Sequence, residues 1–168
     1  MNDGYINRAL LFAAKHFNDS CHNHGKPVYL HCLRVAGDLH RMGYEDDLIV
    51  AAILHDLLED TDCTRSDIAE AFGEPMAVLI ETLSFSPEDG DKWERNRRCL
   101  EACAAHGREA MIVKCADIAD NSAFFSKASP ADQIYLKKKF AYALELAERT
   151  IPQEAALEWF RKKINLCF

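Results

Sequence analysis

Apolar residues recur every three or four positions along most of the chain, which is the spacing of one face of an α-helix. The first two stretches of this kind are separated by Gly25-Lys26-Pro27, which breaks the pattern. The sequence therefore predicts two amphipathic helices near the N-terminus. Their apolar faces hold Leu10, Leu11, Ala14 and Phe17 in the first helix and Val28, Cys32, Val35, Ala36 and Leu39 in the second.

Turn and capping residues delimit the helices that follow. Gly43 ends the second helix, while Thr64 with Asp67 resembles a capping box that opens a helix ending at Gly73. The clearest loop in the middle of the chain runs from Ser84 to Asp91. We expect further helices over residues 48–58, 64–72, from 74 to the loop, 93–105, 108–125, 130–149 and from 152 onward.

No stretch alternates apolar and polar residues as a half-buried strand does, so the sequence predicts an all-α fold. A chain of 168 residues of which 49% are hydrophobic is long enough for one compact domain and too short to argue for two. We therefore expect a single domain over residues 1–168. Residues 152–168 are expected to pack either on the helical bundle or on a second subunit. The second alternative would make the protein a homo-oligomer.

Charge and composition exclude several classes of partner. The formal net charge is -7 and no long Lys/Arg-rich segment is present, which argues against a nucleic-acid polymer or an anionic membrane surface as the main partner. The N-terminus lacks the pattern of a signal peptide and no apolar run is long enough to span a membrane, so we expect a cytoplasmic protein. Seven cysteines without framework spacing fit reduced thiols.

The candidate chemistry begins in the most apolar stretch, Leu48 to Leu58, which runs into His55-Asp56-Leu57-Leu58-Glu59-Asp60. Burying unpaired ionisable groups costs several kcal/mol each, so they need a partner such as a metal ion. On one continuous helix, His55 would stack over Glu59 and Asp56 over Asp60. Imidazole and carboxylate suit Mn, Fe, Zn or Ni, and one helix cannot complete the coordination sphere.

Two further ligand types lie in apolar surroundings on other helices. His31 opens the second helix on its apolar face, and Asp117 lies within the hydrophobic run that starts at Met111. Lys114 and Asn121 share a helical stripe with Asp117, so this stripe can face an anionic substrate. Each residue alone is an ordinary buried or capping residue in most proteins, but three helices carrying such residues predict an interior metal site.

Other groups of metal-binding residue types are weaker candidates. Cys99 and Cys103 lie one helical turn apart, and we interpret them as two ordinary helix residues rather than half of a zinc site. Cys21-His22-Asn23-His24 lacks a second ligand pair at zinc-finger spacing, so we interpret it as a polar loop.

The chain resembles the HD-domain phosphohydrolases, an all-α superfamily with an H…HD…D metal signature. His31, His55-Asp56 and Asp117 match that signature. The extended match of HDxxED with a downstream KxADxxxN resembles the hydrolase domain of RelA/SpoT proteins and the small stand-alone alarmone hydrolases. The resemblance covers about residues 5–125, which would be the catalytic core, with C-terminal helices over 129–168.

The resemblance implies a role for each matching residue. The metal ligands would be His31, His55, Asp56 and Asp117, with Mn²⁺ the usual ion of the family. Glu59 and Asp60 would act on the attacking water and on the protons of the displacement, and Lys114 and Asn121 would lie on the substrate side. The implied reaction removes pyrophosphate from the 3′ position of guanosine tetra- or pentaphosphate.

The chain departs from this family where the substrate is recognised. The family's Arg- or Lys-containing motif before Gly-x-Pro-Tyr is replaced by Cys21-His22-Asn23-His24-Gly25-Lys26-Pro27-Val28, and the arginine usual after Asn121 is absent. Loss of guanidinium contacts weakens the recognition of a highly charged nucleotide. We expect His22 and Lys26 to supply substrate contacts in their place. Further positive charge is available from Lys92, Arg95, Arg97 and Arg98. Such a group of charges on a helix is usually its solvent-exposed face.

Three functions follow as hypotheses. The first is a metal-dependent hydrolase of an alarmone 3′-pyrophosphate. The second is the same class of enzyme acting on a nucleoside monophosphate, a dinucleotide or a non-nucleotide phosphoester. The third is a non-catalytic metal- or nucleotide-binding module that regulates a partner. The retention of all four ligands and of the acidic pair favours an enzyme.

Overall fold

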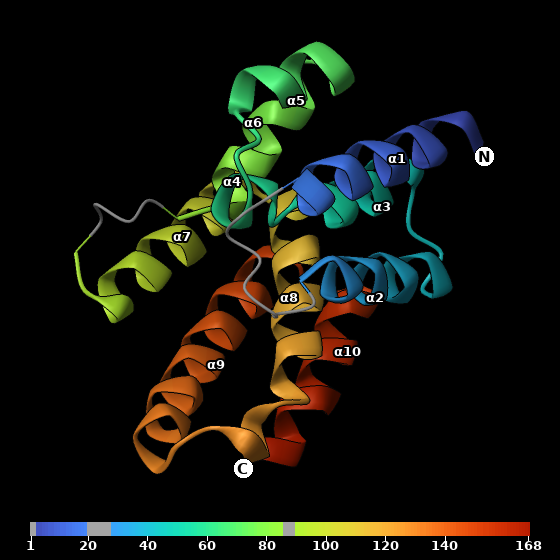
Figure 1. Cartoon of the computed structure of the whole chain (residues 1–168). Coiled ribbons are helices and arrows are strands. Elements are labelled where there is room, and N and C mark those ends of the chain that lie inside the picture. The colour runs from blue at the N-terminus through green and yellow to red at the C-terminus, as the bar shows by residue number, and fades with distance from the viewer. Residues whose placement is uncertain (1–2, 20–27, 86–89) are drawn as a thin grey trace. The chain divides into compact units, whose positions relative to one another are not determined.

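The computed structural model describes residues 3–19, 28–85 and 90–168 (Figure 1). Within these ranges every regular element is an α-helix or a short 3-10 helix, which confirms the predicted all-α class. The chain divides into two compact units, unit 1 (Met1–Ser84) and unit 2 (Phe85–Phe168). The expectation of one domain over residues 1–168 stays a prediction.

Unit 1 is organised around one short, fully apolar helix, α3. Every residue from Leu48 to Leu54 is buried, because α3 is contacted by α1, α2 and α6. A helix that is hydrophobic on all sides belongs at the centre of its unit. The helices of unit 1 are α1 (Asp3–Asp19), α2 (Val28–Arg41), α3 (Asp46–Leu54), α4 (Leu57–Asp60), α5 (Arg65–Phe72) and α6 (Glu74–Leu83).

Two of the predicted helix boundaries of unit 1, at Gly43 and at Thr64, rest on local signals that the structure confirms. Gly43 follows α2 with a φ of 82°, a left-handed conformation that costs glycine little. At the start of α5, the backbone N–H of Asp67 donates to the Thr64 hydroxyl, and the backbone N–H of Thr64 donates to the Asp67 carboxylate at 2.8 Å. Hydrogen bonds from Thr64 hold the pKa of Asp67 below its usual value. This arrangement is the predicted capping box.

Replacing Thr64 with alanine is expected to lower the free energy of unfolding by about 1 kcal/mol, because the N-terminus of α5 loses its cap. Urea denaturation at pH 7 measures this change. Ser66→Ala, at an exposed position of the same helix, is the matched control and should change the free energy of unfolding by less than about 0.5 kcal/mol. Equal effects of the two substitutions would contradict the capping role of Thr64.

Unit 2 has the same organisation around α8. The residues from Ala110 to Ala119 are all buried, because α7, α9 and α10 pack around this helix. Residues 155–164 form the predicted C-terminal helix, which packs on α8 and α9 of its own unit. The helices of unit 2 are α7 (Lys92–His106), α8 (Arg108–Ser122), α9 (Pro130–Thr150) and α10 (Ala155–Ile164), with 3-10 turns η1 (Phe125–Lys127) and η2 (Asn165–Cys167).

One expectation about unit 1 is wrong: residues 48–58 do not form a continuous helix. The helix α3 ends at Leu54, His55 and Asp56 make a turn, and α4 starts at Leu57. Apolar residues continue to Leu58, so the hydrophobic pattern alone does not reveal the break. The predicted stacking of His55 over Glu59 and of Asp56 over Asp60 on one helix is therefore replaced by a turn that presents His55 and Asp56 before the acidic pair.

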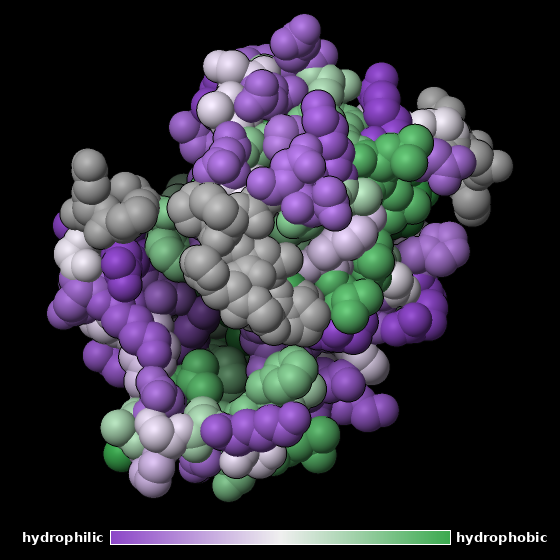
Figure 2. All heavy atoms as spheres, in the orientation of Figure 1, coloured by the Kyte–Doolittle hydropathy of each residue, from purple (hydrophilic) through white to green (hydrophobic). Residues whose placement is uncertain are grey.

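Among the residues that the structure describes, few large apolar side chains are exposed. Figure 2 shows hydrophilic side chains over most of the face in view, with hydrophobic side chains in smaller groups. In the described ranges, no helix has the length and apolar character needed to cross a membrane. The exposed large hydrophobic residues are Leu11, Leu30, Val78, Phe124, Ile134, Leu166 and Phe168.

Candidate metal centre

Unit 1 brings three of the predicted metal ligands together. His31 comes from α2 and His55 from the turn after α3, and their rings lie 5.2 Å apart between centroids. Asp56 contacts both, with its carboxylate oxygens 3.2 Å from His55 Nε2 and 3.8 Å from His31 Nε2. The packing of α2 against α3 therefore places two imidazoles and a carboxylate at one point.

The hydrogen bond of His55 prepares its ring for metal binding. Its Nδ1 lies 2.8 Å from the carbonyl oxygen of Ala52, and a carbonyl oxygen only accepts, so Nδ1 carries the proton. In the neutral imidazole the lone pair is then on Nε2, which is the atom that faces Asp56. Metal-binding histidines commonly have their second nitrogen held by a backbone carbonyl in this way.

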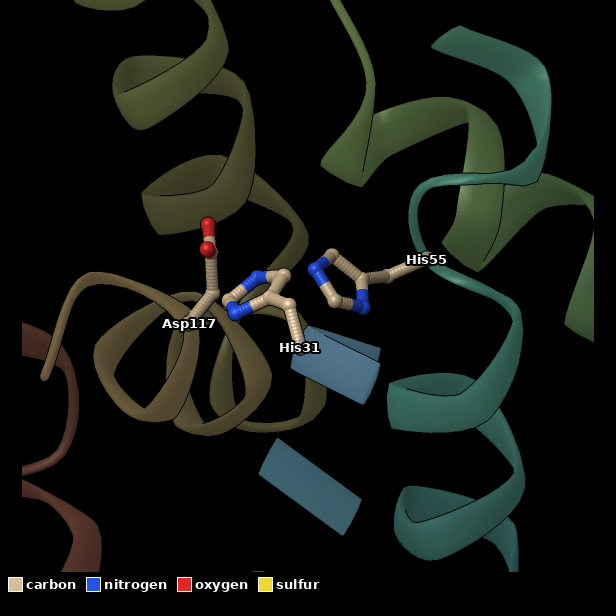
Figure 3. A group of neighbouring side chains, drawn as sticks. All are labelled: His31, His55 and Asp117. Carbon is tan, nitrogen blue, oxygen red and sulfur yellow. The ribbon is translucent and has the colours of Figure 1, made fainter. Parts of the chain in front are cut away.

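Burial also distinguishes these side chains from a surface cluster. His31 is 7% exposed and His55 is 1% exposed, and both lie among core residues of unit 1. Figure 3 shows the two imidazole rings pointing toward one another. Nitrogen and carboxylate oxygen donors in an apolar surrounding are the donor set of a first-row transition metal. The three residues fit a divalent ion.

Cys32 also lies beside this cluster, although the sequence did not indicate it as a candidate ligand. Its thiol donates to Asp56 Oδ2 at 3.8 Å, and one ligand atom each from Cys32, His55 and Asp56 lie within 4.8 Å of one another. The only signal in the sequence is that Cys32 follows His31 on a helix whose apolar face is buried. A thiol next to the carboxylate helps to orient Asp56.

Glu59 and Asp60, the predicted catalytic carboxylates, lie on α4 directly after the turn at His55 and Asp56. The backbone carbonyl of Asp56 accepts hydrogen bonds from the N–H groups of Glu59 at 3.2 Å and Asp60 at 2.9 Å. Both side chains are partly exposed, unlike the histidines. This short helix couples the position of the carboxylates to the backbone of Asp56.

Unit 2 assembles the predicted stripe around Asp117. Lys114 Nζ lies 3.1 Å from Asp117 Oδ2, and Asn121 Nδ2 donates to Asp117 Oδ1 at 2.6 Å. Asp117 is 6% exposed and Lys114 is 8% exposed, so this is a buried ion pair on one helix face. Both oxygens of the carboxylate are thereby oriented. Lys114 and Asn121 thus have a positioning role on Asp117, in addition to the substrate contact that the resemblance implies for them.

Two cysteines of α7, Cys99 and Cys103, lie near this ion pair, whose charges act on their pKa values. The hydrogen bond between the thiols of Cys103 and Cys99 lowers the pKa of Cys99, and the charges of Lys114 and Lys139 act in the same direction, whereas burial and Asp117 oppose it. The pKa of Cys103 is raised by that hydrogen bond and by burial. Cys99 and Cys103 are both buried in α7.

Two of the predicted substrate-binding residues, His22 and Lys26, lie outside the described residues. So does the predicted polar loop from Cys21 to His24.

Comparisons with known proteins agree with the predicted fold and family. Residues 9–150 match the HD domain family, and the chain therefore belongs to this family. It is 36% identical over 118 residues to a guanosine-3′,5′-bis(diphosphate) 3′-pyrophosphohydrolase of Aquifex aeolicus, an alignment that covers 69% of this chain and 17% of that protein. A GTP pyrophosphokinase of Myxococcus xanthus is 30% identical over 124 residues, covering 69% of this chain and 16% of that protein.

Solved structures show the same fold. The structure reported for a metazoan ortholog of SpoT that hydrolyses ppGpp superimposes with a TM-score of 0.77 and 22% sequence identity, covering 99% of this chain and 97% of that one. A protein of Listeria monocytogenes superimposes with a TM-score of 0.72 and 23% identity, covering 85% of this chain and 98% of that one. At these identities the likeness concerns the fold. The chain spans less than a fifth of the length of the two curated relatives, at 17% and 16%.

Proposed function

We propose that this chain is a metal-dependent phosphohydrolase that removes pyrophosphate from the 3′ position of guanosine 3′,5′-bis(diphosphate). The observation that carries the proposal is the convergence of His31, His55 and Asp56 in unit 1, at the positions that match the HD signature. The name of the Aquifex aeolicus relative, which is 36% identical over 118 residues, supports the substrate.

In this proposal Asp117 is the fourth protein ligand, and the ion is Mn²⁺. Both oxygens of Asp117 are oriented by Lys114 and Asn121, which suits a carboxylate that holds an ion in a fixed position. Carboxylates suit Mn²⁺ and imidazoles suit several first-row metals, and the choice of Mn²⁺ rests on the resemblance to the HD-domain phosphohydrolases. Four protein ligands leave room for water and for a substrate oxygen.

In this proposal Glu59 and Asp60, which follow the turn at His55 and Asp56, perform the proton transfers. A bound divalent ion supplies positive charge to the phosphoryl oxygens and makes water more acidic. Glu59 accepts the proton of the attacking water while the water oxygen bonds to the phosphorus on the 3′ oxygen. The bond from that phosphorus to the 3′ oxygen breaks, and Asp60 in its protonated form gives a proton to the 3′ oxygen. The products are guanosine 5′-diphosphate and pyrophosphate.

A second candidate, an HD-domain phosphatase or nucleotidase acting on another phosphoester, is favoured by the departures at the substrate side. Neither the arginine of the N-terminal motif nor the one after Asn121 is present in this sequence. The third candidate, a non-catalytic regulatory module, predicts metal or nucleotide binding without turnover.

One assay separates the three candidates. The full chain is loaded with Mn²⁺ and incubated with guanosine 3′,5′-bis(diphosphate), nucleoside monophosphates, a dinucleotide and simple phosphoesters, and pyrophosphate and phosphate are measured separately. The proposal predicts pyrophosphate and guanosine 5′-diphosphate from the first substrate only when the metal is present. Phosphate release from another member of the panel would favour the second candidate, and metal binding without any product would favour the third.

We further propose that the protein acts in the cytoplasm. Among the described residues the cysteines form no disulfide, and six buried thiols suit a reducing compartment. Self-association is a separate prediction, which sedimentation of the purified chain at several concentrations tests.

A further inference from the structure

Unit 1 holds a second set of metal-binding atoms, which overlaps the ligands of the proposed Mn²⁺ ion. Cys32 follows His31 on α2, and its side chain is fully buried, with an exposure of 0%. One ligand atom each from Cys32, His55 and Asp56 lie within 4.8 Å of one another. All three residues belong to unit 1, so one compact unit supplies the whole set.

The geometry of α2 directs two different donors at the carboxylate of Asp56. Consecutive residues of a helix point about 100° apart, so His31 and Cys32 approach the turn after α3 from different directions. The Cys32 thiol donates to Asp56 Oδ2 at 3.8 Å, and His31 Nε2 lies 3.8 Å from the same oxygen. An ion at this carboxylate can therefore be bound with the thiol as well as with the imidazole.

The thiol changes which ion this set prefers. Sulfur is a softer donor than imidazole nitrogen or carboxylate oxygen, and it selects Zn²⁺ rather than Mn²⁺. Zn²⁺ is bound in proteins by Cys, His and Asp side chains, and Cys32, His55 and Asp56 supply one of each. For a given site, Zn²⁺ also binds more tightly than Mn²⁺, which stands at the weak end of the divalent series.

His55 makes the two ligand sets mutually exclusive. Its Nδ1 donates to the carbonyl oxygen of Ala52 at 2.8 Å, so Nε2, which lies 3.2 Å from Asp56 Oδ1, is the nitrogen that can bind an ion. An ion bound by Cys32, His55 and Asp56 consequently uses two ligands that the proposed Mn²⁺ ion also needs. The two ions compete for the same centre.

We propose that Cys32, His55 and Asp56 bind Zn²⁺ or another thiophilic divalent ion, and that this ion excludes Mn²⁺ and inhibits the enzyme. On binding, a bond forms between Cys32 Sγ and the ion, the thiol proton passes to the solvent, and no oxidation state changes. Zn²⁺ with three protein ligands keeps a single further position, which cannot hold water and a substrate oxygen together. The inhibition rests on the proposed function, whereas the binding of the thiophilic ion does not.

Titration of the full chain with Co²⁺, a coloured substitute for Zn²⁺, tests the site directly, because a thiolate bound to Co²⁺ gives a charge-transfer band in the near ultraviolet. The unchanged protein should develop this band and Cys32→Ser should lose it, although serine keeps a donor for Asp56. Competition with a chromophoric chelator measures affinity. Cys32→Ser should weaken Zn²⁺ binding roughly 10-fold or more, since even groups that only support metal ligands contribute roughly 10- to 100-fold. Its affinity for Mn²⁺ should change far less.

Two other cysteines provide matched controls. Cys63 is a buried thiol of the same unit that donates to the carbonyl oxygen of Thr64 at 3.7 Å, and Cys21 stands beside other ligand types in the sequence. Cys63→Ser and Cys21→Ser should both keep the band and the affinity for Zn²⁺. Thermal unfolding establishes that the variants are folded. X-ray absorption of the Zn²⁺-loaded Cys21→Ser protein needs no change at Cys32 and should show a sulfur ligand at roughly 2.3 Å.

Three results would overturn the inference even if Mn²⁺-dependent pyrophosphate release is observed. The first is a charge-transfer band that is absent from the unchanged protein or persists in Cys32→Ser, and the second is its loss in Cys21→Ser. The third is an equal loss of Zn²⁺ and Mn²⁺ affinity in Cys32→Ser, which would leave Cys32 only a positioning role on Asp56.

The outcomes also separate this inference from the proposed function. A band that depends on Cys32, in a protein that hydrolyses no substrate with Mn²⁺, upholds the thiophilic site and overturns the proposed function. Where both hold, Zn²⁺ inhibits pyrophosphate release in competition with Mn²⁺. Cys32→Ser should then need roughly 10-fold more Zn²⁺, or more, for the same fractional inhibition.

Discussion

Replacing His55 with glutamine is expected to remove the metal ion from the purified protein and to abolish hydrolysis. His55 is 1% exposed, and its Nδ1 is held by Ala52, so Nε2 is the atom available to the ion. Glutamine retains a donor for the Ala52 carbonyl but lacks the imidazole lone pair. Loss of groups that merely support metal ligands costs roughly 10- to 100-fold in metal affinity, and loss of a ligand should cost at least as much.

Mass spectrometry of metals after loading with Mn²⁺ and dialysis measures this effect. His40→Gln, at an exposed position of α2 in the same unit, is the matched control and should retain the ion. Circular dichroism establishes that both variants are helical. Equal metal content in His55→Gln and the unchanged protein would show that His55 is not a ligand.

Replacing Glu59 with glutamine is expected to leave metal content unchanged and to lower kcat by roughly 10²- to 10⁴-fold, the usual contribution of a general base. The amide preserves the size of the side chain and cannot accept the proton of the attacking water. Steady-state release of pyrophosphate measures the rate, and metal analysis of the same sample measures occupancy. Asp62→Asn, two residues after α4 and exposed, is the control and should keep kcat.

A different division of roles would have a different signature. If Glu59→Gln loses the metal together with activity, then Glu59 is a ligand rather than a base. If kcat is unchanged, the proton is accepted by another group, and the proposed role of Glu59 is wrong.

The sequence predicted that His31, His55 and Asp56 lie close together, but it did not predict their local structure. His31 and His55 are ionisable residues in apolar helices, and such residues are rare enough in a core to be found from the pattern alone. The turn at His55 and Asp56 was not predicted, because Leu57 and Leu58 continue the hydrophobic run and contain no helix-breaking residue. The break depends on packing that a local pattern does not contain.

The sequence also predicted the stripe of Lys114, Asp117 and Asn121, because residues three and four positions apart on a helix are neighbours. It did not predict that the lysine and the amide would both bind the carboxylate, since their direction depends on burial of α8 among α7, α9 and α10. The sequence did not predict the pocket of about 450 Å³ that α7, the end of α8 and α9 form in unit 2. Phe85, Phe124 and Tyr135 come from three separate segments, and no spacing relates them before the unit is folded.

The most direct test of the central claim is a crystal structure of the full chain loaded with Mn²⁺, with anomalous diffraction data that locate the ion. The account predicts one strong anomalous peak within coordination distance, roughly 2.0–2.3 Å, of His31 Nε2, His55 Nε2 and carboxylate oxygens of Asp56 and Asp117. A peak bound by other residues, or no peak in a protein that hydrolyses its substrate only with Mn²⁺, would contradict it.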